Sequence, residues 1–239
     1  MKDIIKVAKY FLRDSRQAVM IFYAITIFLG LFLTYMSNGL NGQSGTEASF
    51  GGLGFGVMIF LFVSGLNSFK TNFKFMLANS VSRRDIYFGG ILAFVILAGF
   101  MAIMDIVMSQ FFMAISFYQS FYGQIYGEEK RPIAEFLWNF AVYLFAVSSG
   151  WMITILYYKS GKLMKIFISF IPVIIIFTVI GFNNATDGKV VNAMWDFFVR
   201  VFGFTDNYSS YNAVLTFILT AVTAFGLSYV LVRKMRLKE

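Results

Sequence analysis

The chain contains one long apolar stretch, residues 87–116, which reads YFGGILAFVILAGFMAIMDIVMSQFFMAIS. Only one of its side chains, that of Asp105, is charged. A helix needs about 20 apolar residues to cross the roughly 30 Å hydrocarbon core of a bilayer. This stretch is longer than that, so it predicts a membrane-spanning helix that tilts or projects past the membrane.

The composition of the whole chain agrees with a membrane protein. Of its 239 residues, 59% are hydrophobic and 13% are charged, whereas about a quarter of a soluble domain is charged. The mean hydropathy is +0.72. With 31 Phe and only 2 Pro, intrinsic disorder is excluded as well. We therefore exclude a water-soluble globular enzyme.

Five further segments are apolar and long enough to be considered as spans, although the one that contains Pro172 is short. The six expected spans are residues 18–36, 50–69, 87–116, 133–158, 166–182 and 211–232. The sequence thus predicts an all-α, polytopic membrane protein in which residues 1–239 form a single transmembrane domain.

The basic residues predict the orientation of these spans. Most of the 20 Lys and Arg side chains lie in four segments: before the first span, between the second and third, between the fourth and fifth, and after the sixth. Basic loops stay cytoplasmic, so both termini are expected inside, in agreement with an even number of spans. The +8 net charge therefore indicates topology and no nucleic-acid partner. The length and the lack of Cys fit a bacterial plasma membrane.

The chain lacks the residues of many catalytic sites. It has no Cys and no His, which excludes disulfides, thiol nucleophiles, Cys- or His-ligated metals and His-containing triads. Gly161-Lys162 resembles the end of a phosphate-binding loop, but Leu156 and Leu163 break the pattern. We expect no enzymatic activity, no metal and no cofactor in this chain.

The first 17 residues predict an amphipathic helix on the cytoplasmic membrane surface. Its basic residues follow one helical stripe, and apolar residues form the opposite face. Such a helix places its charged stripe toward anionic lipid. The stripe consists of Lys2, Lys6, Lys9, Arg13 and Arg16.

The connection between the second and third spans predicts a short cytoplasmic helix, residues 69–81, and a break before the third span. Asn79 is a suitable terminator because Asn tolerates the left-handed conformation. Ser82 and Asp85 fit a capping box, in which Asp85 reaches back to the first amide of the new helix. Basic and aromatic residues on such a helix suit a docking surface. The alternative is an ordinary basic loop.

On the other side, residues 191–204 predict an amphipathic helix in the outer leaflet, with Asp196 and Arg200 paired one turn apart. Its alternative is a merely hydrophobic loop.

Asp105 is the only acid expected inside a span, in the outer half of the third, and Gln110 lies five residues further out. An intramembrane charge is costly and is a functional hypothesis by default. Asp105 and Gln110 are therefore candidates for a translocation path. The alternative is a protonated Asp105 bonded to a neighbouring helix.

The layout of these segments resembles the membrane (permease) subunits of type-2 ATP-binding-cassette (ABC) exporters. At residue level the resemblance is carried by residues 75–90, FMLANSVSRRDIYFGG, which look like the start of the third span in that family. The resemblance implies that residues 69–81 are a coupling helix, that two permease copies or paralogues pair around a path, and that ATP and Mg²⁺ are bound by a separate cytoplasmic ATPase. The docking region it implies here is Phe73, Lys74, Met76, Arg83, Arg84 and Asp85.

The resemblance also implies export of, or immunity to, amphipathic or hydrophobic molecules such as antimicrobial or toxin peptides, drugs or lipids. Two other classes stay open. A substrate-capture subunit of a vitamin importer needs a buried polar pocket, and a non-transporting membrane sensor or scaffold needs no ATPase. A proton-coupled carrier is less favoured, because the sequence shows one buried acid and no evident repeat.

Overall fold

The computed structural model describes residues 2–44, 50–127, 131–186, 188–204 and 209–233. Almost all of them are helical, and two short strands pair in parallel, with Phe50 opposite Tyr118. The all-α class is confirmed. The elements are α1 (Lys2–Ser44), β1 (Phe50–Gly51), α2 (Leu53–Ala78), α3 (Arg83–Ile115), β2 (Tyr118–Gln119), α4 (Phe121–Tyr126), α5 (Pro132–Lys159), α6 (Lys162–Ala185), α7 (Lys189–Val201) and α8 (Ser210–Arg233).

Within the described residues, five helices are long and apolar enough to cross a membrane: α1, α2, α3, α5 and α8. The chain therefore has the features of a multi-pass membrane protein. The expected fifth span, residues 166–182, lies in α6. Among the described residues of α6, the apolar stretch is Val173–Asn183, which is shorter than a span. The sixth crossing stays a prediction.

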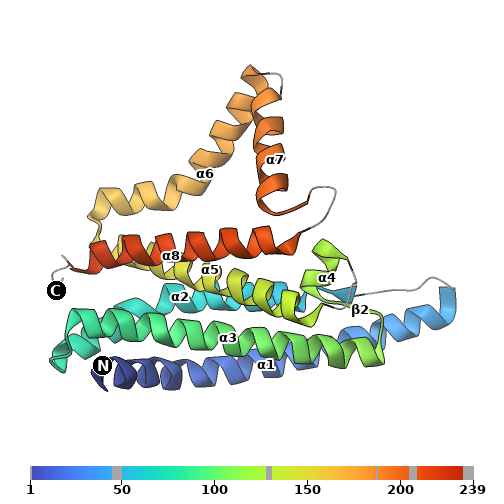
Figure 1. Cartoon of the computed structure of the whole chain (residues 1–239), viewed down its shortest axis with the longest axis horizontal. Coiled ribbons are helices and arrows are strands. Elements are labelled where there is room, and N and C mark those ends of the chain that lie inside the picture. The colour runs from blue at the N-terminus through green and yellow to red at the C-terminus, as the bar shows by residue number, and fades with distance from the viewer. Residues whose placement is uncertain (1, 45–49, 128–130, 187, 205–208, 234–239) are drawn as a thin grey trace.

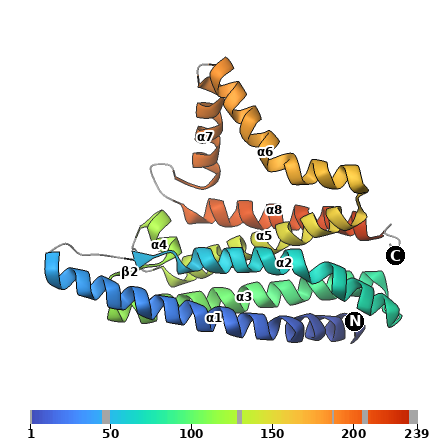
Figure 2. The ribbon, with the colours of Figure 1, turned by 180° about the vertical axis from the view of Figure 1, so that it is seen from behind.

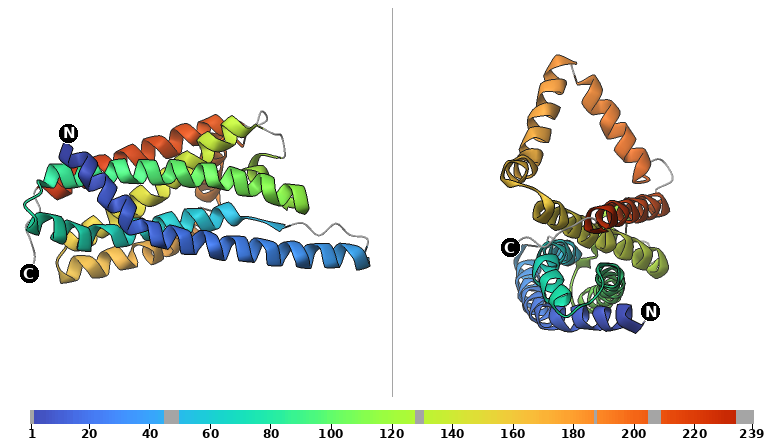
Figure 3. Two further views of the ribbon diagram at one scale, coloured as in Figure 1. Left: turned by 90° about the horizontal axis from the view of Figure 1, so that it is seen from below. Right: turned by 90° about the vertical axis from the view of Figure 1, so that its left-hand side faces the viewer.

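Two expected boundaries are absent because the helices continue through them. α1 runs without a break past residue 17, and α2 includes most of the expected helix 69–81. Residues 2–29 of α1 and residues 66–78 of α2 contain no Gly and no Pro. Nothing in the sequence therefore stops either helix at the expected boundary. Figure 3 nevertheless shows the first turns of α1 crossing the end of the bundle before the helix turns along it.

The five long helices lie side by side along the long axis of the molecule (Figures 1 and 2). One end of this bundle, which we term the basic end, holds the start of α1, the α2–α3 turn, the α5–α6 link and the last turns of α8. The opposite end holds β1, β2 and α4. The described parts of the four basic segments thus lie at one end, as the charge pattern predicts.

α5 lies at the centre of the core, between α2, α3 and α8. Its Trp151 is fully buried and stacks on Tyr87 of α3, with ring centroids 5.0 Å apart. α2 and α5 touch through glycines. A Cβ at Gly65 would clash with the Val147 carbonyl oxygen, and one at Gly150 would clash with that of Phe62. Small residues allow this backbone contact, as in many membrane bundles.

α6 and α7 project away from the bundle as a helical hairpin (Figures 1 and 3). α7 matches the amphipathic helix expected over residues 191–204, and Gly203, with φ at 71°, follows its end. α7 buries none of its residues, and Trp195 and Phe198 are exposed. The expected Asp196–Arg200 ion pair is absent from the described part of the chain. The membrane-surface position of α7 stays a prediction.

Candidate functional site

The α2–α3 turn is held by hydrogen bonds among its own residues. α2 ends at Ala78, and the Asn79 side chain donates a 2.8 Å hydrogen bond back to the Phe75 carbonyl oxygen. Ser80, and not Asn79, has the left-handed backbone, with φ at 61°. Asn79 therefore caps the helix with its side chain, and the left-handed step comes one residue later than its sequence suggests.

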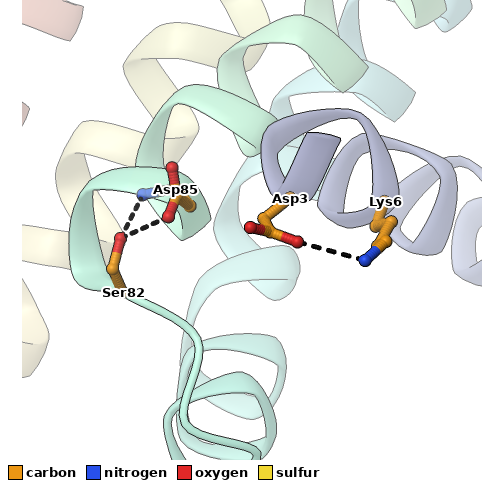
Figure 4. A network of polar contacts seen from close by, with 4 residues as sticks. All are labelled: Asp3, Lys6, Ser82 and Asp85. Carbon is orange, nitrogen blue, oxygen red and sulfur yellow. Dashed lines mark hydrogen bonds and ion pairs between the residues drawn. The ribbon is translucent and has the colours of Figure 1, made fainter. Parts of the chain in front are cut away.

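Ser82 caps α3, as predicted. Its hydroxyl oxygen accepts a 3.1 Å hydrogen bond from the Asp85 backbone N–H (Figure 4). In the predicted capping box, the Asp85 carboxylate accepts a hydrogen bond from a backbone amide. Here it accepts a 2.6 Å hydrogen bond from the Ser82 hydroxyl instead. Asp3 and Lys6 of α1 form an exposed ion pair nearby, 3.2 Å between their charged atoms. The start of α3 is thus set by local bonds.

Two of the predicted docking residues are buried in the chain's own core. Phe73 is 1% exposed and Met76 is 4% exposed. The Phe73 ring stacks on that of Phe69, with centroids 4.7 Å apart. The prediction that Phe73 and Met76 lie on an exposed surface is therefore wrong. The apolar face of an amphipathic helix packs inward, and this segment follows that rule.

The exposed face of the same segment carries an aromatic residue that the sequence reasoning missed. Phe75 is 51% exposed, and its ring stacks on Tyr10 of α1 at a centroid distance of 5.3 Å. Lys74, Arg83 and Arg84 are exposed as predicted, and Asp85 is half-buried. We term the exposed group the corner surface. Its members are Lys70, Lys74, Phe75, Arg83, Arg84 and Phe88.

Contacts with α1 support the corner from behind. Besides the Tyr10–Phe75 stack, the Asn72 side-chain amide donates a 3.2 Å hydrogen bond to the Asp14 carboxylate. A hollow of about 40 Å³ lies beside this bond, between α1, α2 and α3. The corner therefore contacts α1 as well as belonging to α2 and α3. The polar residues that line the hollow are Asp14, Ser15, Ser64, Ser68 and Asn72.

Asp105 points into the bundle and is 4% exposed, whereas Gln110 is exposed. Five residues correspond to about 140° around a helix, so the two side chains leave α3 in different directions. The structure therefore does not bring Asp105 and Gln110 together.

A buried polar cluster surrounds Asp105 at the end opposite the basic end. The Asn139 amide donates a 3.0 Å hydrogen bond to the Asp105 carboxylate. The Tyr143 hydroxyl donates a 3.4 Å hydrogen bond to the Gly54 carbonyl oxygen. These four residues come from α3, α5 and α2, so the cluster ties three helices together.

Glu135 is a second buried acid and is only 7% exposed. It lies near the start of the fourth expected span, residues 133–158, although Asp105 alone was expected as an acid inside a span. It belongs to the first turn of α5. Its spacing of four from Asn139 is the signal that could have placed it on the same helix face.

Tyr118 of β2 also faces the cluster. Its burial and, to a smaller extent, the negative charge of Asp105 raise the pKa of Tyr118. The phenol is therefore a hydrogen-bonding group here and not an acid. Within the described residues, no group of three or more His, Cys, Asp or Glu side chains gathers in a way that could hold a metal ion.

Gly54, in the first turn of α2, leaves room for the side chains of this cluster. A Cβ at Gly54 would lie 3.1 Å from the Asp105 carboxylate and 3.2 Å from the Tyr143 hydroxyl.

Comparison of the chain with protein-family models, with curated proteins and with solved structures finds no match. The functional assignment therefore has to be argued from the geometry above.

Proposed function

We propose that this chain is the membrane permease subunit of an ATP-driven transporter, of the kind found in type-2 ABC exporters, and that a separate cytoplasmic ATPase docks on the corner surface. The observation that carries this proposal is the corner itself. It presents exposed Lys, Arg and Phe side chains at the junction of two candidate spans, α2 and α3.

The continuity of α2 supports a mechanical role for the corner. The helix runs from Leu53 to Ala78, so its last turns and its membrane part move as one body. Coupling between distant sites needs such packed, rigid elements. A partner that pulls on Lys74 or Phe75 would thus displace α2, and through Tyr10 it would also displace α1.

The remaining parts of the proposal follow from the charge pattern and from the family resemblance. The basic end faces the cytoplasm of a bacterium, and the first turns of α1 lie on anionic lipid. Two copies or paralogues pair around the path. The substrate is an amphipathic or hydrophobic molecule, such as an antimicrobial or toxin peptide, a drug or a lipid. ATP and Mg²⁺ bind to the partner subunit.

Purification of the tagged protein from its native membrane in mild detergent tests the proposal. Mass spectrometry should find a stoichiometric soluble chain that carries G-x-x-x-x-G-K-[ST]. The double variant Lys74→Glu/Arg84→Glu should retain at least tenfold less of this chain. Arg200→Glu, an equivalent charge reversal on exposed α7, should retain it fully.

Other outcomes favour the rival classes. A protein that runs alone, or only with partners that lack this motif, would contradict the permease proposal and favour a sensor or scaffold. A complex that also contains a dedicated long-helix membrane coupler would favour the substrate-capture subunit of a vitamin importer.

A further inference from the structure

The hollow beside the Asn72–Asp14 hydrogen bond is polar on one side only. It measures about 40 Å³ and lies between α1, α2 and α3. The residues that α2 contributes to its wall are all polar, those of α3 are all apolar, and α1 contributes both kinds. The polarity is therefore confined to the contact between α1 and α2. The residues from α2 are Ser64, Ser68 and Asn72, and those from α3 are Ala93, Phe94 and Leu97.

Three of the polar groups in this wall already donate a hydrogen bond within the protein. The Ser15 hydroxyl donates a 3.0 Å bond to the Phe11 carbonyl oxygen, and the Ser68 hydroxyl donates a 3.2 Å bond to the Gly65 carbonyl oxygen. The Asn72 amide donates to the Asp14 carboxylate. The oxygen atoms of these side chains keep lone pairs that can accept further bonds. A molecule that suits the hollow therefore brings hydrogen-bond donors.

Water has both room in the hollow and a route to it. A bound water needs about 10–15 Å³ and two to four polar partners, so the hollow is large enough for at least two. Asp14 is exposed, whereas Asn72 is only 4% exposed. The hydrogen bond between them thus leads from the surface into the interior. Cavities that stay dry are lined by apolar groups, and this one is not.

We propose that the hollow is a binding site for water, in which at least two molecules bridge Asp14 and Ser15 of α1 to the serine hydroxyls of α2. Each water supplies two hydrogens to the acceptors of the wall. Among the described residues that line the hollow, Asp14 alone is charged. The site does not depend on the permease proposal, because it follows from the packing of this chain alone.

The bound water gives α1 two unlike contacts at the same level of the bundle. Towards α3 the contact is apolar: Val7 and Phe11 are 4% and 5% exposed, and the Phe11 ring packs edge-on against that of Phe94. Separation of α1 from α3 would expose this apolar surface, which is costly. Separation of α1 from α2 at the hollow would expose groups that already bond to water. The hydrated contact is thus where α1 can separate from a neighbour at the lowest cost.

Single cysteines and Ag⁺ test the site in the full chain, reconstituted in lipid nanodiscs in chloride-free buffer. Ag⁺ is a small aqueous ion that binds thiolates, and the chain has no Cys of its own. Ser64→Cys, on the wall of the hollow, should react with Ag⁺ within about tenfold of the rate of Lys74→Cys on the corner surface. Ser148→Cys is the matched control, because Ser148 is 0% exposed and belongs to the core of α5. It should react at least about a hundredfold more slowly.

Filling the hollow should remove this access. Ala93→Leu or Ser68→Leu, each combined with Ser64→Cys, should slow the reaction at least about tenfold. Thermal unfolding checks that both variants fold. A rate for Ser64→Cys as slow as that for Ser148→Cys would show a dry or lipid-filled hollow and overturn the proposal. An undiminished rate in both filled variants would overturn it as well. A rate that Na⁺ slows, and choline at equal ionic strength does not, would show that an alkali cation occupies the site instead of water.

Discussion

At the scale of single residues, neighbours in the sequence have opposite surroundings. Phe73 lies in the core. Phe75, two positions later, is exposed, and its ring stacks on that of Tyr10 at the surface of the molecule. Two residues correspond to about 200° around a helix, so this reversal follows from helix geometry. Phenylalanine thus stabilises the core at position 73 and forms part of the corner surface at position 75.

The two phenylalanines should therefore respond differently to truncation. Phe73→Ala removes a fully buried ring and should destabilise the protein by about 3–5 kcal/mol. Phe75→Ala should change stability by less than about 1 kcal/mol and reduce retention of the ATPase. Thermal unfolding in detergent and quantitative co-purification measure the two effects. Equal loss of stability in both variants would show that Phe75 is part of the core.

At the scale of elements, the start of α3 depends on one hydroxyl. Ser82→Ala removes the acceptor of the Asp85 amide bond and should cost about 1 kcal/mol. The loss should appear as faster amide hydrogen exchange at residues 83–86. Ser82→Thr keeps the hydroxyl and is the matched control. Unchanged exchange in Ser82→Ala would mean that packing alone holds the corner.

The contact between α2 and α5 depends on Gly150. An added methyl group there meets the backbone of Phe62, which cannot rotate away as a side chain could. Gly150→Ala should therefore destabilise the bundle by a few kcal/mol, within the range of overpacked cores. A methyl group at Gly99 meets only Phe140 atoms at 3.8 Å, so Gly99→Ala should be neutral or gain up to about 1 kcal/mol. Similar thermal unfolding of both variants would contradict this packing.

At the scale of the whole molecule, the apolar runs suffice to predict an all-α membrane bundle, because length and hydropathy decide membrane insertion. The helix boundaries are harder to predict, since α1 and α2 continue beyond their apolar parts. The capping role of Ser82 was predictable because it is local. The Asp105–Asn139 bond joins residues far apart in the sequence, and the sequence alone therefore gives no signal for it.

The number of crossings determines on which sides the termini lie. Because the chain has no Cys, single cysteines report accessibility without background. With six crossings, Asn192→Cys on α7 should react with a membrane-impermeant thiol reagent from outside, and Lys74→Cys only from inside. Asn192→Cys that reacts only from inside would show that α6 does not cross the membrane.

The central claim is that the corner surface touches an ATPase. A photo-crosslinking amino acid at position 75 tests this contact directly in native membranes, with position 195 on α7 as the exposed aromatic control. The account predicts an adduct with a soluble chain that carries G-x-x-x-x-G-K-[ST] from position 75 and none from position 195. An adduct of position 75 only with lipid, or with a protein that lacks this motif, would contradict the account.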